Sequence, residues 1–431
     1  MKKKTVLLAL FLFSSLLLLN LNKNFETVNI NSNGLASASL EIEKLWEVNE
    51  TATAIYIGEG FLYSVVRTFN SILTETNITE TKSAVVISKR DIEDGSLVWS
   101  KTVELVNVTI WLSHDSVLMK EGFLYTVWRY RNTTSLDFSL LSKWTAEGEL
   151  VWNLTFDGVT NPTLSEDNES VYVFGKTGYP PSPYIARIFN NGVIDWNRTI
   201  EIEFDDGLDD FSSSGIWANE ENVYALGSYY SVDWPFLFKI SKEGEFIWYK
   251  ELRGAGKGWP SICGNSESLF IASNNYGSIP REFSISKWNF DGENIWTVLQ
   301  NDLRIGSIWA NNKNLYSSGY VRMGSLFQYE FSLIELDLEG NAHWDKREAN
   351  TGIPSTSYFL VKGDNESLYT VSPWSIIRWK LPQDNGSPNV NPQDYAIIIL
   401  FGVASASVIG IAVLIYLKAR RKKKMKMIYW V

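Results

Sequence analysis

Short stretches of alternating apolar and polar residues follow one another along most of the chain, and this period of two predicts β-strands. ISKRDI and LVWSKTV alternate in this way on either side of Gly95. Six turns share a Gly that is followed four residues later by Trp, with Asp, Glu or Asn directly before the Gly. This combination is typical of tight hairpin turns, in which Gly adopts a positive φ. The six turns therefore predict six β-hairpins.

A second marker, an apolar pair that ends in an aromatic residue, occurs seven times. The aromatic residues are Tyr63, Tyr125, Tyr172, Tyr224, Phe270, Tyr316 and Tyr369. Another short apolar strand precedes several of the copies, as in GIWA and SIWA. Each repeat of about 50 residues thus contains four strands, which is the composition of one β-propeller blade. The seven copies predict seven blades.

The two ends of the repeat region complement each other. The last repeat stops at SIIRWKLPQDNG without a fourth strand, whereas EIEKLWEV, which contains Trp46, is a lone strand before the first repeat. We therefore expect the N-terminal strand to complete the last blade and close the ring, because closure removes two exposed sheet edges. The predicted fold class is all-β, a seven-bladed β-propeller of four-stranded blades over residues 39–382, with one C-terminal transmembrane helix outside it.

The tryptophans divide into two groups. Those that follow the repeat are interpreted as structural, because one flat ring per blade can fill the wedge between neighbouring blades. These blade tryptophans are Trp46, Trp99, Trp152, Trp196, Trp248, Trp296 and Trp344. Six others do not follow the period and are the better candidates for a functional surface: Trp111, Trp128, Trp144, Trp234, Trp259 and Trp374.

Both termini have targeting signals. Lys2, Lys3 and Lys4 precede an apolar run, so residues 1–38 are predicted to be a signal peptide, with an uncleaved anchor as the alternative. Residues 395–417 contain no charge and are long enough for a transmembrane helix. A polar stalk, 383–394, precedes this helix, and a basic tail, 418–431, follows it. Basic residues stay on the cytoplasmic side, so we expect a single-pass protein of the cell membrane with the propeller outside.

The predicted ectodomain is strongly acidic. Residues 39–394 contain 28 of the 39 Lys and Arg and 48 of the 49 Asp and Glu, a net charge near −20. This balance argues against nucleic acid as a partner and favours cationic partners or ions. Gly402, Ala406 and Gly410 form a small-residue face in the predicted membrane helix, which suggests a homodimer. Glycosylation candidates are Asn49, Asn77, Asn107, Asn132, Asn153, Asn168, Asn197 and Asn365; Asn385 is a poorer one.

The repeat resembles that of the pyrroloquinoline-quinone (PQQ)-type propeller family, A-x-D-x-x-T-G-x-x-x-W. Its Gly and Trp match six times, but its Asp is present only as Asp91, and its Thr is replaced throughout. The resemblance implies that Trp docks adjacent blades. Quinoprotein dehydrogenases of the family have a vicinal Cys pair and a calcium ion beside the quinone, and Cys263 alone cannot supply that pair. Non-enzymatic relatives use the propeller as a binding scaffold.

Few residues suggest specific chemistry. Asp205, Asp206, Asp209 and Asp210 place four carboxylates within six residues, which is compatible with a calcium (Ca²⁺) site, although a solvated acidic loop is the favoured interpretation. No other cofactor is predicted. Cys263 has the same offset from Phe270 as other inner-strand residues have from their aromatic marker, so we expect a buried structural residue. His114 and His343 are in no recognised catalytic motif, and we expect surface or turn positions for them.

These observations predict a cell-surface binding or scaffold protein that presents a β-propeller to a protein, a glycan or an envelope component. No catalytic residues are predicted. The alternative is a quinone- or metal-dependent oxidoreductase, or a hydrolase, with its site in the propeller funnel. Acidic residues from different blades can meet in space, and the sequence does not show such pairs.

Overall fold

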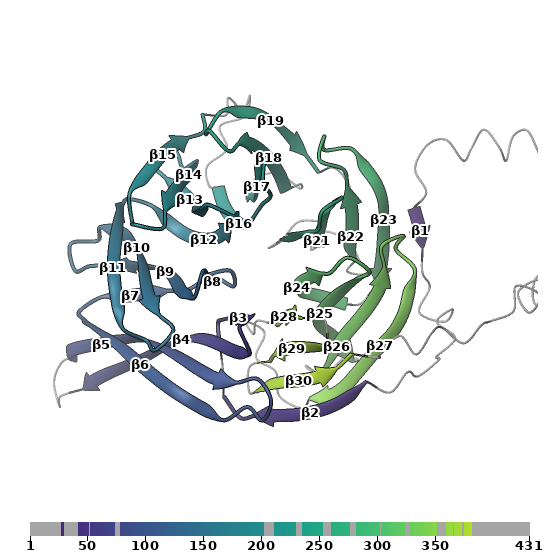
Figure 1. Ribbon diagram of the computed structural model, residues 1–431, viewed down its shortest axis with the longest axis horizontal. Coiled ribbons are helices and arrows are strands. Elements are labelled where there is room, and N and C mark those ends of the chain that lie inside the picture. Colours follow the sequence, from purple (N-terminus) through teal and green to yellow (C-terminus); the bar gives the residue numbers. More distant parts are fainter. Residues whose placement is uncertain are drawn as a thin grey trace, which may run out of the picture. The chain divides into compact units, whose positions relative to one another are not determined.

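The computed structural model of the chain describes residues 27–29, 42–50, 52–73, 78–201, 211–229, 235–252, 260–275, 282–301, 303–323, 328–350, 359–364, 366–372 and 375–381. Thirty strands in this part of the chain form seven sheets. The sheets are arranged in a ring (Figure 1), which confirms the predicted seven-bladed propeller. The described residues include no helix that is long and apolar enough to cross a membrane, and residues 395–417 lie outside them.

The first three blades follow the chain directly. Blade 1 contains β3 (Ala54–Gly58), β4 (Phe61–Leu73), β5 (Ile78–Asp91) and β6 (Leu97–Val106). Blade 2 contains β7 (Thr109–Trp111), β8 (Val117–Lys120), β9 (Phe123–Arg131), β10 (Asp137–Thr145) and β11 (Leu150–Asp157). Blade 3 contains β12 (Thr160–Glu166), β13 (Ser170–Thr177), β14 (Ser182–Phe189) and β15 (Ile194–Thr199). In blade 2, β7 and β8 both pair with β9 and together form a divided inner strand.

The remaining blades repeat this order. Blade 4 contains β16 (Phe211–Ala218), β17 (Asn222–Tyr229), β18 (Pro235–Ser241) and β19 (Phe246–Glu251). Blade 5 contains β20 (Ser261–Gly264), β21 (Leu269–Asn275), β22 (Glu282–Trp288) and β23 (Asn294–Asn301), and the short β1 (Thr27–Asn29) pairs with β23. Blade 6 contains β24 (Leu303–Ala310), β25 (Asn314–Met323), β26 (Gln328–Asp337) and β27 (Ala342–Asn350).

Blade 7 is assembled from both ends of the repeat region. Its strands are β28 (Leu360–Gly363), β29 (Ser367–Val371), β30 (Ile376–Lys380) and β2 (Glu43–Val48). β2 lies beside β30 (Figure 1). The two strands pair antiparallel, and Trp46 is opposite Arg378 in their register. The N-terminal strand therefore completes the last blade, as the sequence predicted.

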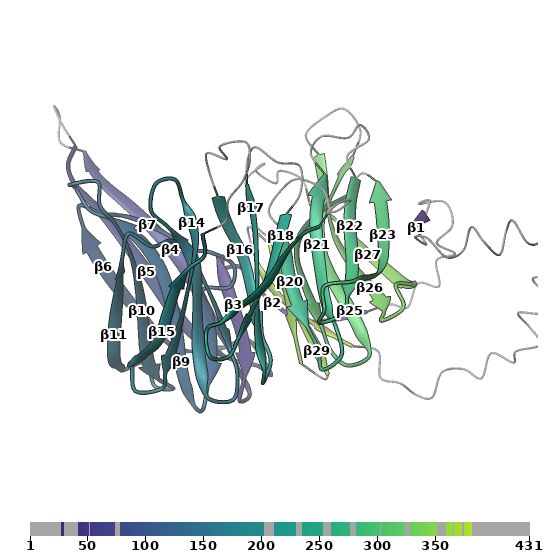
Figure 2. The ribbon, with the colours of Figure 1, turned by 90° about the horizontal axis from the view of Figure 1, so that it is seen from above.

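The strands run between two faces of the ring, as the edge-on view of Figure 2 shows. We call the end at which the inner strands begin, near Thr160 and Ser261, the entry face. We call the other end the turn face, because it has the turns between first and second strands and between third and outer strands. β30 ends at Lys380 on the turn face, and Leu381 follows it there.

The hydrophobic core lies mainly between adjacent blades. One buried cluster joins Tyr172 and Phe174 of blade 3 to Phe211 and Phe236 of blade 4. Another joins Tyr316 and Phe331 of blade 6 to residues of blade 7. Each sheet thus buries its faces against its two neighbours, as stacked repeats do.

The outer-strand tryptophans dock against the next blade. Trp46, Trp99, Trp152, Trp196 and Trp296 each donate a hydrogen bond from Nε1 to a backbone carbonyl in the following blade, over 2.9 to 3.2 Å. The repeated Gly packs on the ring of the preceding blade, because a Cβ on Gly244 would lie 2.6 Å from Trp196 and one on Gly292 would lie 2.7 Å from Trp248. Each tight turn therefore forms the socket for a neighbouring Trp.

A cation on the third strand adds to this contact in six blades. The residue paired with the blade Trp is Lys89, Lys143, Arg187, Lys239, Lys287 or Arg378. Each donates to a backbone carbonyl of the next blade's turn. In blade 6, Glu335 occupies the corresponding position and accepts a hydrogen bond from Asn314. The blade that follows, blade 7, is the one whose third and outer strands come from opposite ends of the propeller.

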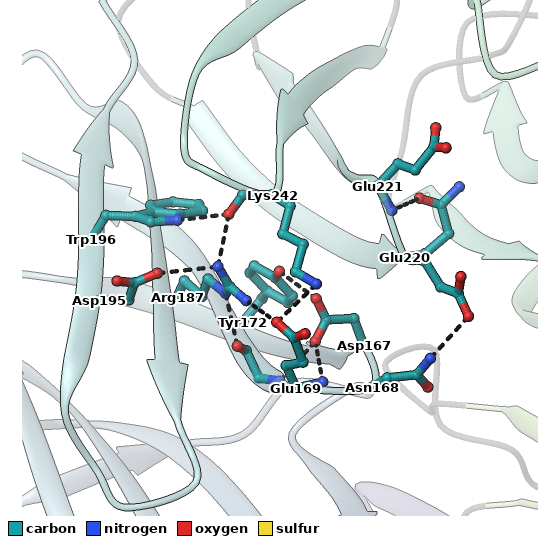
Figure 3. A network of polar contacts seen from close by, with 12 residues as sticks. Asp167, Asn168, Glu169, Tyr172, Arg187, Asp195, Trp196, Glu220, Glu221 and Lys242 are labelled. Carbon is teal, nitrogen blue, oxygen red and sulfur yellow. Dashed lines mark hydrogen bonds and ion pairs between the residues drawn. The ribbon is translucent and has the colours of Figure 1, made fainter.

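Figure 3 shows this contact between blades 3 and 4. The carbonyl oxygen of Lys242 accepts hydrogen bonds from Trp196 Nε1 and Arg187 Nη1, over 2.9 and 3.3 Å. Arg187 also forms ion pairs with Asp195 and Glu169, and Glu169 reaches Lys242 Nζ at 2.8 Å. The guanidinium is buried, and these partners compensate its charge.

Candidate functional site

A pocket opens near the ring axis on the entry face. Its cavity measures about 150 Å³ and is lined by blades 2, 3, 4 and 5. The lining residues of this entry-face pocket are Trp111, Leu112, Ser113, His114, Asp115, Arg129, Asn161, Pro162, Ser212, Ser213, Ser214, Pro260 and Ser261. Serine hydroxyls, one amide, one guanidinium and an indole converge there, so the pocket combines apolar surface with a few fixed polar groups, as ligand sites do.

The division of the inner strand in blade 2 supplies the pocket's central residues. β7 pairs with Arg129–Arg131 and β8 with Phe123–Thr126, so residues 112–116 form an extra segment between them. The carbonyl of Asp115 accepts a hydrogen bond from Leu164 N of blade 3 over 2.7 Å. Its carboxylate forms an ion pair with Lys362 Nζ of blade 7 at 3.1 Å. Asp115 therefore ties together blades that are not neighbours in the ring.

Burial changes the protonation of two groups near this ion pair. It lowers the pKa of His114 to about 4, although the Asp115 carboxylate acts in the opposite direction. The imidazole is therefore neutral at physiological pH. Burial also raises the pKa of the Cys263 thiol far above its ordinary range, so the thiol is not a nucleophile at neutral pH.

Arg129 forms the charged part of the pocket wall. Its guanidinium lies over the Trp111 ring, 4.4 Å from the centroid, and its Nε donates to Asp137 Oδ1 over 2.8 Å. Arg131 donates to the same carboxylate from Nε and Nη2. These contacts lower the pKa of Asp137, against the effect of its burial. A planar ring and a shared carboxylate thus hold Arg129 in one orientation.

A second cleft, of about 460 Å³, lies on the turn face. It is lined by Met119, Lys120, Glu121, Glu166, Asp167, Asn168, Ala218, Asn219 and Glu220. Burial raises the pKa of Glu166 to about 7, with Lys120 opposing the shift. Tyr56 donates a hydrogen bond to Glu166 Oε1 over 3.4 Å. Glu166 can therefore gain or lose a proton near neutral pH.

The sequence candidates have different outcomes. Asp205, Asp206, Asp209 and Asp210 lie outside the described residues, so the calcium hypothesis stays a prediction. Among the residues that are described, no group of three or more His, Cys, Asp or Glu side chains is placed to hold a metal ion. Cys263 lies on inner strand β20 opposite Phe270, as its repeat position indicated. The side chains of His343 and Glu335 approach to 3.5 Å beside blade 6's outer strand.

The glycosylation candidates are mostly exposed where they are described. Asn49, Asn107, Asn153, Asn168 and Asn197 are exposed. Asn132 is half-buried, and its Oδ1 accepts hydrogen bonds from the backbone of Thr134 and Leu136. Asn77 and Asn365 lie outside the described residues. Whether any of them carries a glycan stays a prediction.

The aperiodic tryptophans do not form one surface. Trp111 lines the entry-face pocket, whereas Trp128 and Trp144 are buried in the core. Trp234, Trp259 and Trp374 lie outside the described residues. His114 is in a turn between β7 and β8, as expected, and it lines the entry-face pocket. No motif marks the pocket serines, since Ser212–Ser214 and Ser261 begin inner strands of different blades.

Comparison with known proteins carries no argument about the chemistry of this chain. No protein-family model matches the chain, and no curated protein sequence matches it. It is similar to Chaetomium thermophilum Raptor over 79% of this chain and 29% of that one, with 8% identity and a TM-score of 0.49. It is also similar to the polysaccharide lyase Uly1 (83% and 97% covered, 10% identity, TM-score 0.44). A subtype N10 neuraminidase-like protein of A/little yellow-shouldered bat/Guatemala/060/2010 matches over 63% and 99%, at 9% identity and a TM-score of 0.41. Nothing about a ligand or an activity follows for this chain from likenesses of this degree.

Proposed function

We propose that the protein is a cell-surface binding module whose ligand site is the entry-face pocket. The observation that carries this proposal is the convergence of fixed polar groups from four blades on one cavity near the ring axis. The blades hold these groups rigidly, because Trp and cation contacts join blades 2 to 5, which line the pocket, to one another. A ligand therefore meets a preorganised site, which reduces the entropic cost of binding.

The pocket and the end of the described propeller lie on different faces. The described propeller ends at Leu381 on the turn face, and the entry-face pocket opens at the opposite end. The predicted stalk, 383–394, spans at most about 40 Å before the predicted membrane helix. The chain therefore leaves the described propeller on the face opposite the one on which the pocket opens.

Glycan and peptide arrays probed with the full-length chain in detergent test the proposal. We expect ligands that are retained by the wild type and lost by Trp111→Ala, because this side chain lines the pocket. Glu220→Ala, an exposed residue of the turn-face cleft, is the matched control and should leave binding unchanged. Binding that survives Trp111→Ala and is lost in Glu220→Ala would move the site to the turn face. An absence of any ligand would contradict the proposal.

A hydrolase is the second candidate, and Glu166 is the observation that favours it. A carboxyl group with a pKa of about 7 in an open cleft suits a general acid. Hydrolysis of a glycoside library at pH 6 by the wild type, abolished in Glu166→Gln and retained in Glu220→Gln, would support this role. Equal rates in all three proteins, or none, would exclude it.

The PQQ-type resemblance is part of the same proposal. The contacts between each repeated Gly and the preceding blade's Trp, in six consecutive pairs from Trp46–Gly95 to Trp296–Gly340, fit the docking role that the resemblance implies. These contacts support a repeat geometry shared with the PQQ-type family, and no cofactor follows from them.

A further inference from the structure

The charged groups at and around the blade 2 wall of the entry-face pocket, with Lys362 of blade 7, include more cations than carboxylates. Arg129 and Arg131 share one carboxylate, that of Asp137. The carboxylate that lines the pocket, Asp115, is paired with Lys362, and His114 is neutral. Together these three cations and two carboxylates, of which Arg129 and Asp115 line the pocket, leave an excess of one positive charge. A single negative charge on a ligand would balance it, whereas a cation would meet repulsion.

Arg129 is ready to receive such a charge. It uses Nε for Asp137, and within the described part of the chain neither of its Nη groups has a hydrogen-bond partner. Its side chain is only 15% exposed and lies over Trp111. Because the fork is already fixed, little side-chain entropy is lost when it binds a carboxylate through both Nη groups.

The blade 4 wall offers hydroxyl groups. Ser212, Ser213 and Ser214 are at the beginning of β16, and Ser213 Oγ donates to the carbonyl of Asn161. Ser214 Oγ is buried and makes no hydrogen bond to any described residue. Buried hydroxyls are rarely left without a partner, so this one is a point where a ligand hydroxyl would gain a hydrogen bond.

We propose that the entry-face pocket binds a sugar acid, meaning a hydroxylated ring that carries one carboxylate. This inference rests on the proposed function and adds the class of ligand. Arg129 Nη groups receive the carboxylate, and Ser214 Oγ bonds a ring hydroxyl. The cavity of about 150 Å³ suits a single ring, because drug-sized ligands occupy pockets of roughly 300 to 1,000 Å³.

Calorimetric titration of the full-length chain in detergent tests the inference with three probes. D-glucuronate carries both the ring and the carboxylate, D-glucose lacks the charge, and acetate lacks the ring. We expect glucuronate to bind at least about tenfold more tightly than either control, because each lacks one set of charge-assisted or hydroxyl contacts. Added salt should weaken glucuronate binding and leave glucose unaffected.

Variants connect this binding to the named residues. Arg129→Met should weaken glucuronate binding about tenfold to a hundredfold, and Arg198→Met, an exposed arginine of β15, should not change it. Ser214→Ala should weaken it about fivefold without loss of stability, because the hydroxyl makes no internal hydrogen bond. Ser214→Ala keeps the test valid if Arg129→Met does not fold.

Three results would overturn the inference. Equal affinity for glucose and glucuronate would show an uncharged ligand class. An equal loss in Arg198→Met and Arg129→Met would show unspecific charge attraction. Array ligands that need Trp111, together with no binding of glucuronate, would refute the sugar acid while the proposed binding function stands. If no array ligand needs Trp111 either, the proposed function fails as well.

Discussion

Trp46 and Arg378, from the two ends of the propeller sequence, donate hydrogen bonds to the same atom, the carbonyl oxygen of Ile92. The distances are 3.0 Å from Trp46 Nε1 and 2.7 Å from Arg378 Nη1. The two residues also lie opposite each other between β2 and β30. One contact thus closes blade 7 and docks it on blade 1, so closure of the ring uses the same chemistry as the other blade contacts that have a cation on the third strand.

Trp46→Ala should therefore destabilise the whole propeller. The truncation removes the hydrogen bond to Ile92 and the ring surface against Gly95, and we expect a loss of about 3 kcal/mol in the free energy of unfolding. Leu45→Ala changes the neighbouring side chain, which is 39% exposed, and should cost less than about 1 kcal/mol. Urea unfolding measures both values. Equal costs would show that the Trp socket contributes little to closure.

Two glycines separate backbone strain from interblade packing. Gly60 has a φ of 78° with no atom within 4 Å of an added Cβ, so Gly60→Ala should cost about 1 kcal/mol through φ alone. Gly244 has a φ of 85°, and an added Cβ would lie 2.6 Å from Trp196. Gly244→Ala should cost about 1 to 3 kcal/mol more. Thermal and urea unfolding of both variants measure these two losses of stability. Similar losses in Gly60→Ala and Gly244→Ala would argue that the packing of Gly244 on Trp196 contributes little.

The ion pair between Asp115 and Lys362 should show measurable coupling. Both side chains are partly shielded, with exposures of 19% and 28%, and they come from blades 2 and 7. A double-mutant cycle with Asp115→Asn and Lys362→Met should give a coupling energy of about 1 kcal/mol or more. The exposed pair Lys44–Glu47 is the control and should give below about 0.5 kcal/mol. Equal coupling energies in the two cycles would mean that solvent fully screens the ion pair between Asp115 and Lys362.

His114 should make the fold sensitive to mild acid. Its pKa is lowered from 6.5 to about 4 in the folded protein, so between these values the unfolded chain binds a proton that the folded chain does not. Its contribution to stability is complete above pH 6.5 and is lost as the pH falls toward 4. His114→Gln should remove about 2 kcal/mol of this decline between pH 7 and pH 4.5. Urea unfolding at both pH values tests this, and parallel declines in wild type and variant would contradict it.

The fold could be predicted from the sequence because the blades repeat the same turn and the same contact with the next blade. Gly at a turn with positive φ and Trp on the outer strand are both fixed by local geometry and therefore recur at a fixed spacing. The sequence contains a further signal: Lys or Arg stands nine or ten residues before Trp in five consecutive repeats, beginning with Lys89. It marks the third-strand cation, and Glu335 breaks the series where the next blade is closed by β2.

The pocket could not be predicted in the same way. Its residues come from four blades, and the position of each in the pocket depends on where its strand begins. The aperiodic tryptophans gave a partial indication of the pocket, because one of them, Trp111, lines it. Trp128 and Trp144 gave the same signal and are core residues, with exposures of 1% and 7%. The inward course of residues 112–116 has no marker in the sequence, since it results from the divided inner strand of blade 2.

The place of β30 within blade 7 has a mechanical consequence. The chain beyond Leu381 continues directly from β30, which is hydrogen-bonded to β29 on one side and to β2 on the other. Tension on that part of the chain is transmitted along an interior strand and loads both ladders in shear. An outermost strand would instead peel away one bond at a time. A propeller that is pulled from this point therefore resists being opened.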